Sequence, residues 1–149
     1  MTDEERYTFS SLMTLLIETE EKLGQLYEAM AKTTDHPKLK FLLSDCHKNS
    51  LKRMETMRRA RVESVVEMTL QPITGLRFTE PMAKIRAAIE SKSVSIEKAM
   101  TIERALSELY SMVSPKIMQI SADTGELLLT LSRESTERFH ELEQYVRSV

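Results

Sequence analysis

The sequence is poor in the residues that interrupt regular structure. It has 3 glycines, 4 prolines and no tryptophan among 149 residues. The many tight turns of an all-β fold depend on glycine and proline, so we expect long helices instead. Hydrophobic residues make up 41% of the chain and charged residues 30%, which is the balance of a folded protein. A chain of this length fits a single domain, residues 1–149, with a sizeable core.

Features typical of membrane, secreted or nucleic-acid-binding proteins are also missing. No apolar run approaches the roughly 20 residues that span a bilayer. The acidic start, residues 1–6, lacks the layout of a signal peptide. Cys46 is the single cysteine, which excludes an intrachain disulfide and a Cys-x-x-Cys zinc site. The net charge of -2 gives no overall attraction to nucleic acid or anionic lipid. We therefore expect a cytoplasmic protein with no nucleic-acid or membrane partner.

Helical periodicity of the apolar residues predicts four long helices. Their expected ranges are Asp3 to Lys32, Pro37 to Met68, Pro81 to Val113 and Asp123 to Arg147. Expected N-caps are Thr2, Asp35 and Asp123. The connection 69–80 contains Pro72 and Gly75 and reaches roughly 40 Å when extended. The expected fold is thus an all-α four-helix bundle of two antiparallel hairpins, 1–68 and 81–149. The length of the connection favours a long crossover at 69–80, with a plain up-down-up-down bundle as the alternative.

A single glutamate interrupts the apolar stripe of the first helix and of the third. Each glutamate is followed seven residues later by a tyrosine, as Glu20 and Tyr27 and as Glu103 and Tyr110. A buried carboxylate is stable only if it is paired, protonated or bound to metal. The expected stripes are Phe9, Met13, Leu16, Glu20, Leu23, Tyr27 and Met30, and then Met82, Ile85, Ile89, Ile96, Ala99, Glu103, Leu106, Tyr110 and Val113.

The second and fourth helices each carry a histidine three residues after a polar residue, in Ser44-x-x-His47 and Glu137-x-x-His140. Together with the two glutamates, these motifs indicate a duplicated two-helix unit. Two glutamates and two Glu-x-x-His motifs in a bundle core bind two metal ions. The expected inner faces are Lys40, Leu43, His47, Leu51, Met54, Arg58, Val62 and Val65, and then Leu128, Leu131, Ser135, Phe139, Leu142 and Val146.

At these residues the chain resembles the rubrerythrin-like branch of the ferritin-like superfamily. The resemblance implies a ferritin-like bundle that binds one or two iron ions, with manganese or zinc as alternatives. It also implies an oxidoreductase activity, the oxidation of ferrous iron by peroxide or dioxygen. The implied metal ligands are Glu20, His47, Glu103, Glu137 and His140.

Several features depart from the family pattern and define the alternative. Ser44 replaces a glutamate, Glu137 and His140 project away from the apolar face of their helix, and the Cys-x-x-Cys knuckles are absent. The alternative is a metal-free bundle without a cofactor, acting as a structural or protein-interaction module and forming a homodimer or larger homo-oligomer through the fourth helix. In it Glu20 and Glu103 would bond to the tyrosines or to a basic residue such as Arg58. The basic stretch from Lys48 to Arg61, Arg53 included, is expected to be solvated.

Overall fold

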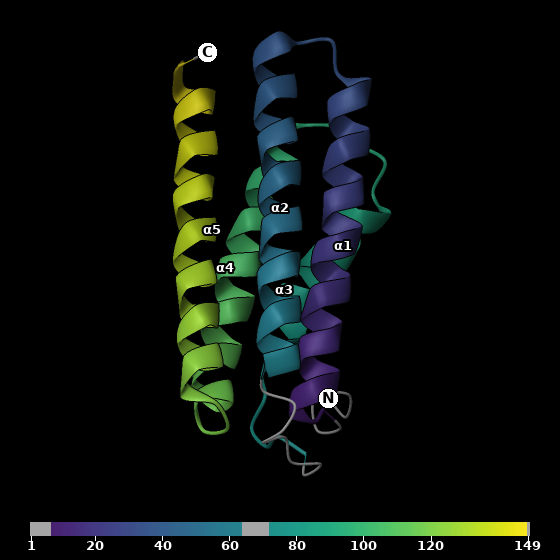
Figure 1. Cartoon of the computed structure of the whole chain (residues 1–149). Coiled ribbons are helices and arrows are strands. Elements are labelled where there is room, and N and C mark those ends of the chain that lie inside the picture. Colours follow the sequence, from purple (N-terminus) through teal and green to yellow (C-terminus); the bar gives the residue numbers. More distant parts are fainter. Residues whose placement is uncertain (1–6, 64–71, 149) are drawn as a thin grey trace.

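The computed structural model describes residues 7–63 and 72–148. In these ranges the chain forms five α-helices and no strand, which confirms the all-α class (Figure 1). None of the helices in the described ranges is long and apolar enough to cross a membrane. The helices are α1 (Phe9–Thr33), α2 (Pro37–Glu63), α3 (Thr79–Glu90), α4 (Ile96–Met118) and α5 (Ala122–Ser148).

Helix α1 buries the stripe that its periodicity predicts. All seven predicted residues, Glu20 included, are buried. The helix begins at Phe9, where Thr8 and Ser11 form a reciprocal capping box. The predicted cap at Thr2 lies outside the described residues.

Helix α2 buries a face that agrees only in part with the predicted one. Of the predicted residues Leu43 is buried, His47 and Met54 are half-buried, Lys40 and Arg58 are exposed, and Val65 lies outside the described residues. Leu51 and Val62 were expected inside, yet they are 42% and 64% exposed. The reason is that Arg53 turns inward to two buried carboxylates, which rotates the predicted apolar face partly into solvent. The N-cap also differs, because the His36 side chain, and not Asp35, accepts a hydrogen bond from the Leu39 amide at 3.3 Å. The buried residues are Leu42, Leu43, Cys46, Ser50, Arg53 and Met57.

The predicted third helix is two helices, α3 and α4. The chain leaves the helix at Ser91 and re-enters it after Ser95, whose hydroxyl accepts from the Lys98 amide at 3.1 Å. Lys98 Nζ also donates to the carbonyl oxygens of Ser91 at 2.7 Å and Ser93 at 3.0 Å. The side chain of Lys98 thus stabilises a corner that the apolar periodicity does not reveal.

The turn between α4 and α5 also differs from the prediction. Helix α4 continues beyond Val113 and through Pro115 to Met118. The cap of α5 is Ser121 in place of Asp123, with its hydroxyl accepting from the Thr124 amide at 3.2 Å. A Cβ atom at Gly125 would lie 2.8 Å from the Met118 Cα, so only glycine allows this close turn.

The long helices form two antiparallel hairpins, α1 with α2 and α4 with α5 (Figure 1). Residues 72–78 lie at the start of α1, where the Ile73 amide donates to the Tyr7 carbonyl at 2.7 Å. From there α3 runs back along the bundle, so that α4 runs in the same direction as α2 (Figure 1). The connection between the hairpins thus returns the chain to the opposite end and includes a helix of its own.

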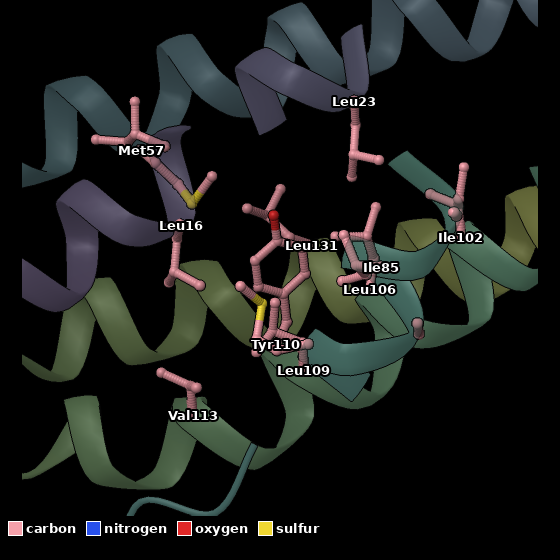
Figure 2. Packing of buried hydrophobic residues seen from close by; sticks show 14 of the residues in the cluster. Leu16, Leu23, Met57, Ile85, Ile102, Leu106, Leu109, Tyr110, Val113 and Leu131 are labelled. Atoms are coloured by element: carbon pink, nitrogen blue, oxygen red, sulfur yellow. The ribbon is translucent and has the colours of Figure 1, made fainter. Parts of the chain in front are cut away.

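The core is formed by apolar side chains from all five helices. Figure 2 shows Leu16 of α1, Met57 of α2, Ile85 of α3 and Leu131 of α5 around Tyr110 of α4. Tyr110 is fully buried, and Figure 2 shows its ring among these apolar side chains. A buried hydroxyl requires a hydrogen-bond partner, and that partner belongs to the polar cluster described next.

Candidate functional site

The centre of the bundle holds two carboxylates on either side of one guanidinium. Glu20 of α1 and Glu103 of α4 are both 0% exposed, and Arg53 of α2 is 3% exposed. Arg53 Nε lies 2.7 Å from Glu20 Oε2, and its Nη2 lies 3.3 Å from Glu20 Oε1. The same Nη2 lies 3.4 Å from Glu103 Oε2. The side chain of Arg53 therefore links the two hairpins through their buried charges.

Two tyrosines complete the cluster crosswise between α1 and α4. Tyr27 Oη donates to Glu103 Oε2 at 2.6 Å, and Tyr110 Oη donates to Glu20 Oε2. Burial, together with the negative charges of Glu103 and Glu20, holds the pKa of both tyrosines well above its ordinary value. Both hydroxyls thus stay protonated as donors, which is the role predicted for them.

The cluster holds two carboxylates and one guanidinium. Burial alone would lower the pKa of Arg53, but the charges of Glu20 and Glu103 hold it well above its ordinary value. Two buried side-chain atoms in the described part of the chain have no hydrogen-bond partner, Glu103 Oε1 and Ser135 Oγ. Both carboxylate oxygens of Glu20 therefore have hydrogen-bond partners, whereas one carboxylate oxygen of Glu103 has none.

The five predicted metal ligands do not all come together. Glu20 and Glu103 meet at the centre, as described. The half-buried ring of His47 faces α1, with Nδ1 2.8 Å from the Gly24 carbonyl oxygen. Glu137 is exposed beside a surface cavity, and His140 is 63% exposed, with Nδ1 3.5 Å from Glu143 Oε1.

The residues at the centre do not fit a di-metal site. Oε2 of each glutamate already accepts from a tyrosine and from Arg53. The guanidinium between the carboxylates would repel a metal cation. Within residues 7–63 and 72–148, no three His, Cys, Asp or Glu side chains are grouped so that they could hold a metal ion. Arg53, and not Arg58, is the basic residue that pairs with the glutamates.

Sequence reasoning missed a second repeated motif, Ser-x-x-Arg. It occurs as Ser50-x-x-Arg53 in α2 and as Ser135-x-x-Arg138 in α5. Both serines are buried, and Arg53 Nη2 lies 3.3 Å from Ser50 Oγ. The same offset along the chain pairs further buried residues of α2 and α5, namely Leu43 with Leu128, Cys46 with Leu131 and Met57 with Leu142.

This register of the repeat differs from the predicted one. The predicted register pairs Ser44-x-x-His47 with Glu137-x-x-His140, which places half-buried residues opposite exposed ones. In the register given by burial, Ser50 and Arg53 correspond to Ser135 and Arg138. The sequence signal for this register is the Ser-x-x-Arg motif. It follows Leu-x-x-Cys in α2 and Leu-x-x-Leu in α5 at the same distance along the chain.

Comparison with known proteins identifies no relative, since no protein-family model, no curated protein and no solved structure matches the chain.

Proposed function

We propose that this chain is a ferritin-like bundle in which Arg53 takes the place of a metal centre, and that it acts as a structural or protein-interaction module. The carrying observation is the position of Arg53 between Glu20 and Glu103. In di-metal bundles, cations neutralise glutamates that project inward from different helices. Here the guanidinium of Arg53 bonds to both carboxylates and offsets one of their two negative charges, a role that metal ions fill in such sites.

The topology supports the ferritin-like part of this proposal. Two antiparallel hairpins joined by one long connection, with α2 and α4 running in the same direction, are the layout of ferritin-like folds. Each hairpin supplies a tyrosine that donates to the glutamate of the other hairpin, Tyr27 to Glu103 and Tyr110 to Glu20. The two hairpins therefore make equivalent contacts. Each hairpin contributes one glutamate, one tyrosine and one Ser-x-x-Arg motif.

The interaction part rests on the apolar side chains that α2 leaves exposed. Leu51 and Val62 lie about three helical turns apart, on one face of the helix. Phe41, which is 63% exposed, adds apolar surface nearer the start of α2. On α5, Leu127, Leu129 and Phe139 are half-buried, and one large apolar residue, Val146, is exposed, at 38%, although it was expected on the inner face. Self-association is therefore better supported through α2 than through the fourth predicted helix.

The first test measures metal binding and stability together. Purified protein is dialysed anaerobically against ferrous iron, then analysed for bound iron and for its thermal unfolding midpoint. We expect no tightly bound iron and no change in the midpoint, because Arg53 already occupies the centre. About two bound irons per chain with a raised midpoint would refute the metal-free proposal.

The second test addresses self-association. Light scattering after size-exclusion chromatography gives the mass of the wild type and of the variant Leu51→Glu/Val62→Glu. The matched control is Thr101→Glu, which places a charge on an exposed position of α4. We expect an oligomer that the α2 variant alone dissociates. A monomeric wild type at all concentrations would exclude self-association, and the partner would then be another protein.

Iron-dependent oxidation is the second candidate function, and one observation favours it. Glu20 and Glu103 converge from two helices, as bridging carboxylates do in di-iron proteins. Metal binding at this place would require Arg53 to leave both carboxylates. If iron bound in the dialysis experiment, peroxide-dependent oxidation of the bound ferrous iron would be the next measurement.

A further inference from the structure

The buried cluster is asymmetric although the motifs that form it are repeated. On the α2 side, Arg53 bonds both oxygens of Glu20 and lies within hydrogen-bond distance of Ser50 Oγ. On the α5 side, the corresponding atoms are Glu103 Oε1 and Ser135 Oγ. These two are the atoms without a partner among the buried side chains of the described residues. What is missing is a donor equivalent to Arg53.

The repeat supplies such a donor, because Arg138 follows Ser135 as Arg53 follows Ser50. In this structure the Arg138 guanidinium bonds to side chains of α2 and α5, and its Nε donates to the Asn49 side-chain oxygen at 3.1 Å. Its Nη2 lies 2.8 Å from Asp45 Oδ2, and its Nη1 lies 2.7 Å from Glu141 Oε1. The Arg138 side chain is nevertheless only 12% exposed.

A cavity of about 180 Å³ between α2 and α5 has both arginines in its lining. Arg138 and Arg53 therefore border a common space between the two helices, although Glu103 and Ser135 are not in its lining. The remaining lining residues are Asn49, Lys52, Glu134, Glu137 and Glu141.

We propose that Arg138 has a second, inward position, in which its guanidinium donates to Glu103 Oε1 and Ser135 Oγ as Arg53 does to Glu20 and Ser50. The inward position gives the core two guanidinium groups for two carboxylates and satisfies both unpartnered atoms. The outward position keeps the Arg138 charge near solvent, on two carboxylates that are 38% and 61% exposed. This proposal does not rest on the proposed function, because the metal-free bundle depends on Arg53 and not on Arg138.

Opposing contributions to the free energy determine which of the two positions Arg138 occupies. Ion pairs with half-exposed carboxylates contribute little to stability, so the outward contacts hold Arg138 weakly. A buried charged acceptor without a partner is destabilising, which favours the inward position. Desolvation of the guanidinium opposes the inward movement.

The test follows the Arg138 Nε–H group by NMR in protein labelled with [15N]arginine. The variants Arg53→Lys and Arg138→Lys assign the two resonances. Asp45→Asn/Glu141→Gln removes the two charged outward partners and leaves Asn49, and the readout is the rate of hydrogen exchange at Arg138 Nε. We expect exchange at least about tenfold slower than in the wild type, because an inward guanidinium is shielded from water.

Two further variants make the result specific. Glu134→Gln removes a carboxylate that lines the same cavity and is not among the ion-pair partners of Arg138, so it should leave the exchange rate unchanged. Adding Ser135→Ala to the double variant should reverse part of the slowing, because it removes one inward acceptor. An unchanged rate in Asp45→Asn/Glu141→Gln, or equal slowing in Glu134→Gln, would overturn the proposal.

Discussion

Replacing Arg53 by methionine tests whether this side chain is the counter-charge that the buried carboxylates require. The substitution keeps an unbranched apolar chain but removes the ion pairs to Glu20 at 2.7 Å and to Glu103 at 3.4 Å. Removing one partner of a buried ion pair costs about 3–5 kcal/mol, since the remaining charge has no compensation. A folded domain is stable by only about 5–15 kcal/mol in total. We therefore expect Arg53→Met to lose a large part of the free energy of unfolding, measured by urea denaturation with circular dichroism.

Two variants separate the loss of charge balance from a general effect of losing arginine. Arg59→Met removes an arginine from the same helix whose side chain is 74% exposed and lies 3.9 Å from Glu55, so it should cost about 0–1 kcal/mol. Neutralising the carboxylates as well, in Arg53→Met/Glu20→Gln/Glu103→Gln, should recover most of the loss, because no unpaired charge then remains buried. The reasoning is refuted if Arg53→Met costs no more than Arg59→Met.

Further predictions concern the tyrosines, a glycine and the cysteine. Tyr27→Phe removes a donor to a buried carboxylate at 2.6 Å and should cost about 1.5–3 kcal/mol in urea denaturation. Folding raises the pKa of Tyr27 and Tyr110 above the unfolded value of about 10, so the folded state holds more protons at alkaline pH. The contribution of the two tyrosines to the free energy of unfolding is therefore complete below about pH 10 and is lost as the pH rises further. Urea midpoints that stay constant to pH 11 would contradict this. Gly125→Ala would bring a Cβ within 2.8 Å of the Met118 Cα in α4 and should cost about 1–3 kcal/mol. At Gly24 the nearest atom to an added Cβ is the Ser50 Cβ at 3.6 Å, so Gly24→Ala should be neutral or stabilising by up to about 1 kcal/mol. Burial holds the pKa of Cys46 well above its ordinary value, so the folded protein should react with a thiol reagent only at the rate at which the protein opens.

The parts of the fold that depend on local periodicity could be predicted from the sequence. The stripe of α1 is apolar at helical spacing apart from Glu20, and every residue in it is buried. The stripe that contains Glu103 is buried from Ile96 to Val113 for the same reason. The interruption at residues 91–95 was missed because Ile89 and Ile96 keep the seven-residue spacing across it.

The buried arginine could not be predicted from the pattern of its own helix. Arg53 lies in a stretch of lysines and arginines, where a solvated face is the ordinary expectation. Its burial depends on carboxylates from α1 and α4, which are distant in the sequence. His47 was favoured instead because histidine is a common metal ligand, although its ring contacts the α1 backbone. Non-local charge pairing thus accounts for the inward position of Arg53, which the apolar pattern of α2 alone does not predict.

The division of the long helices into two hairpins has a consequence for the order of folding events. Most helix–helix contacts lie within the hairpins, α1 with α2 and α4 with α5, and contacts between residues close in the sequence form fastest. Glu20 and Arg53 belong to the same hairpin, so their ion pair can form before the hairpins dock. Glu103 and Tyr110 reach it only in the docking step, together with the loss of water from the charges. Substitutions at the α1–α2 turn should then change the folding rate, whereas Tyr110→Phe should act mainly on the unfolding rate.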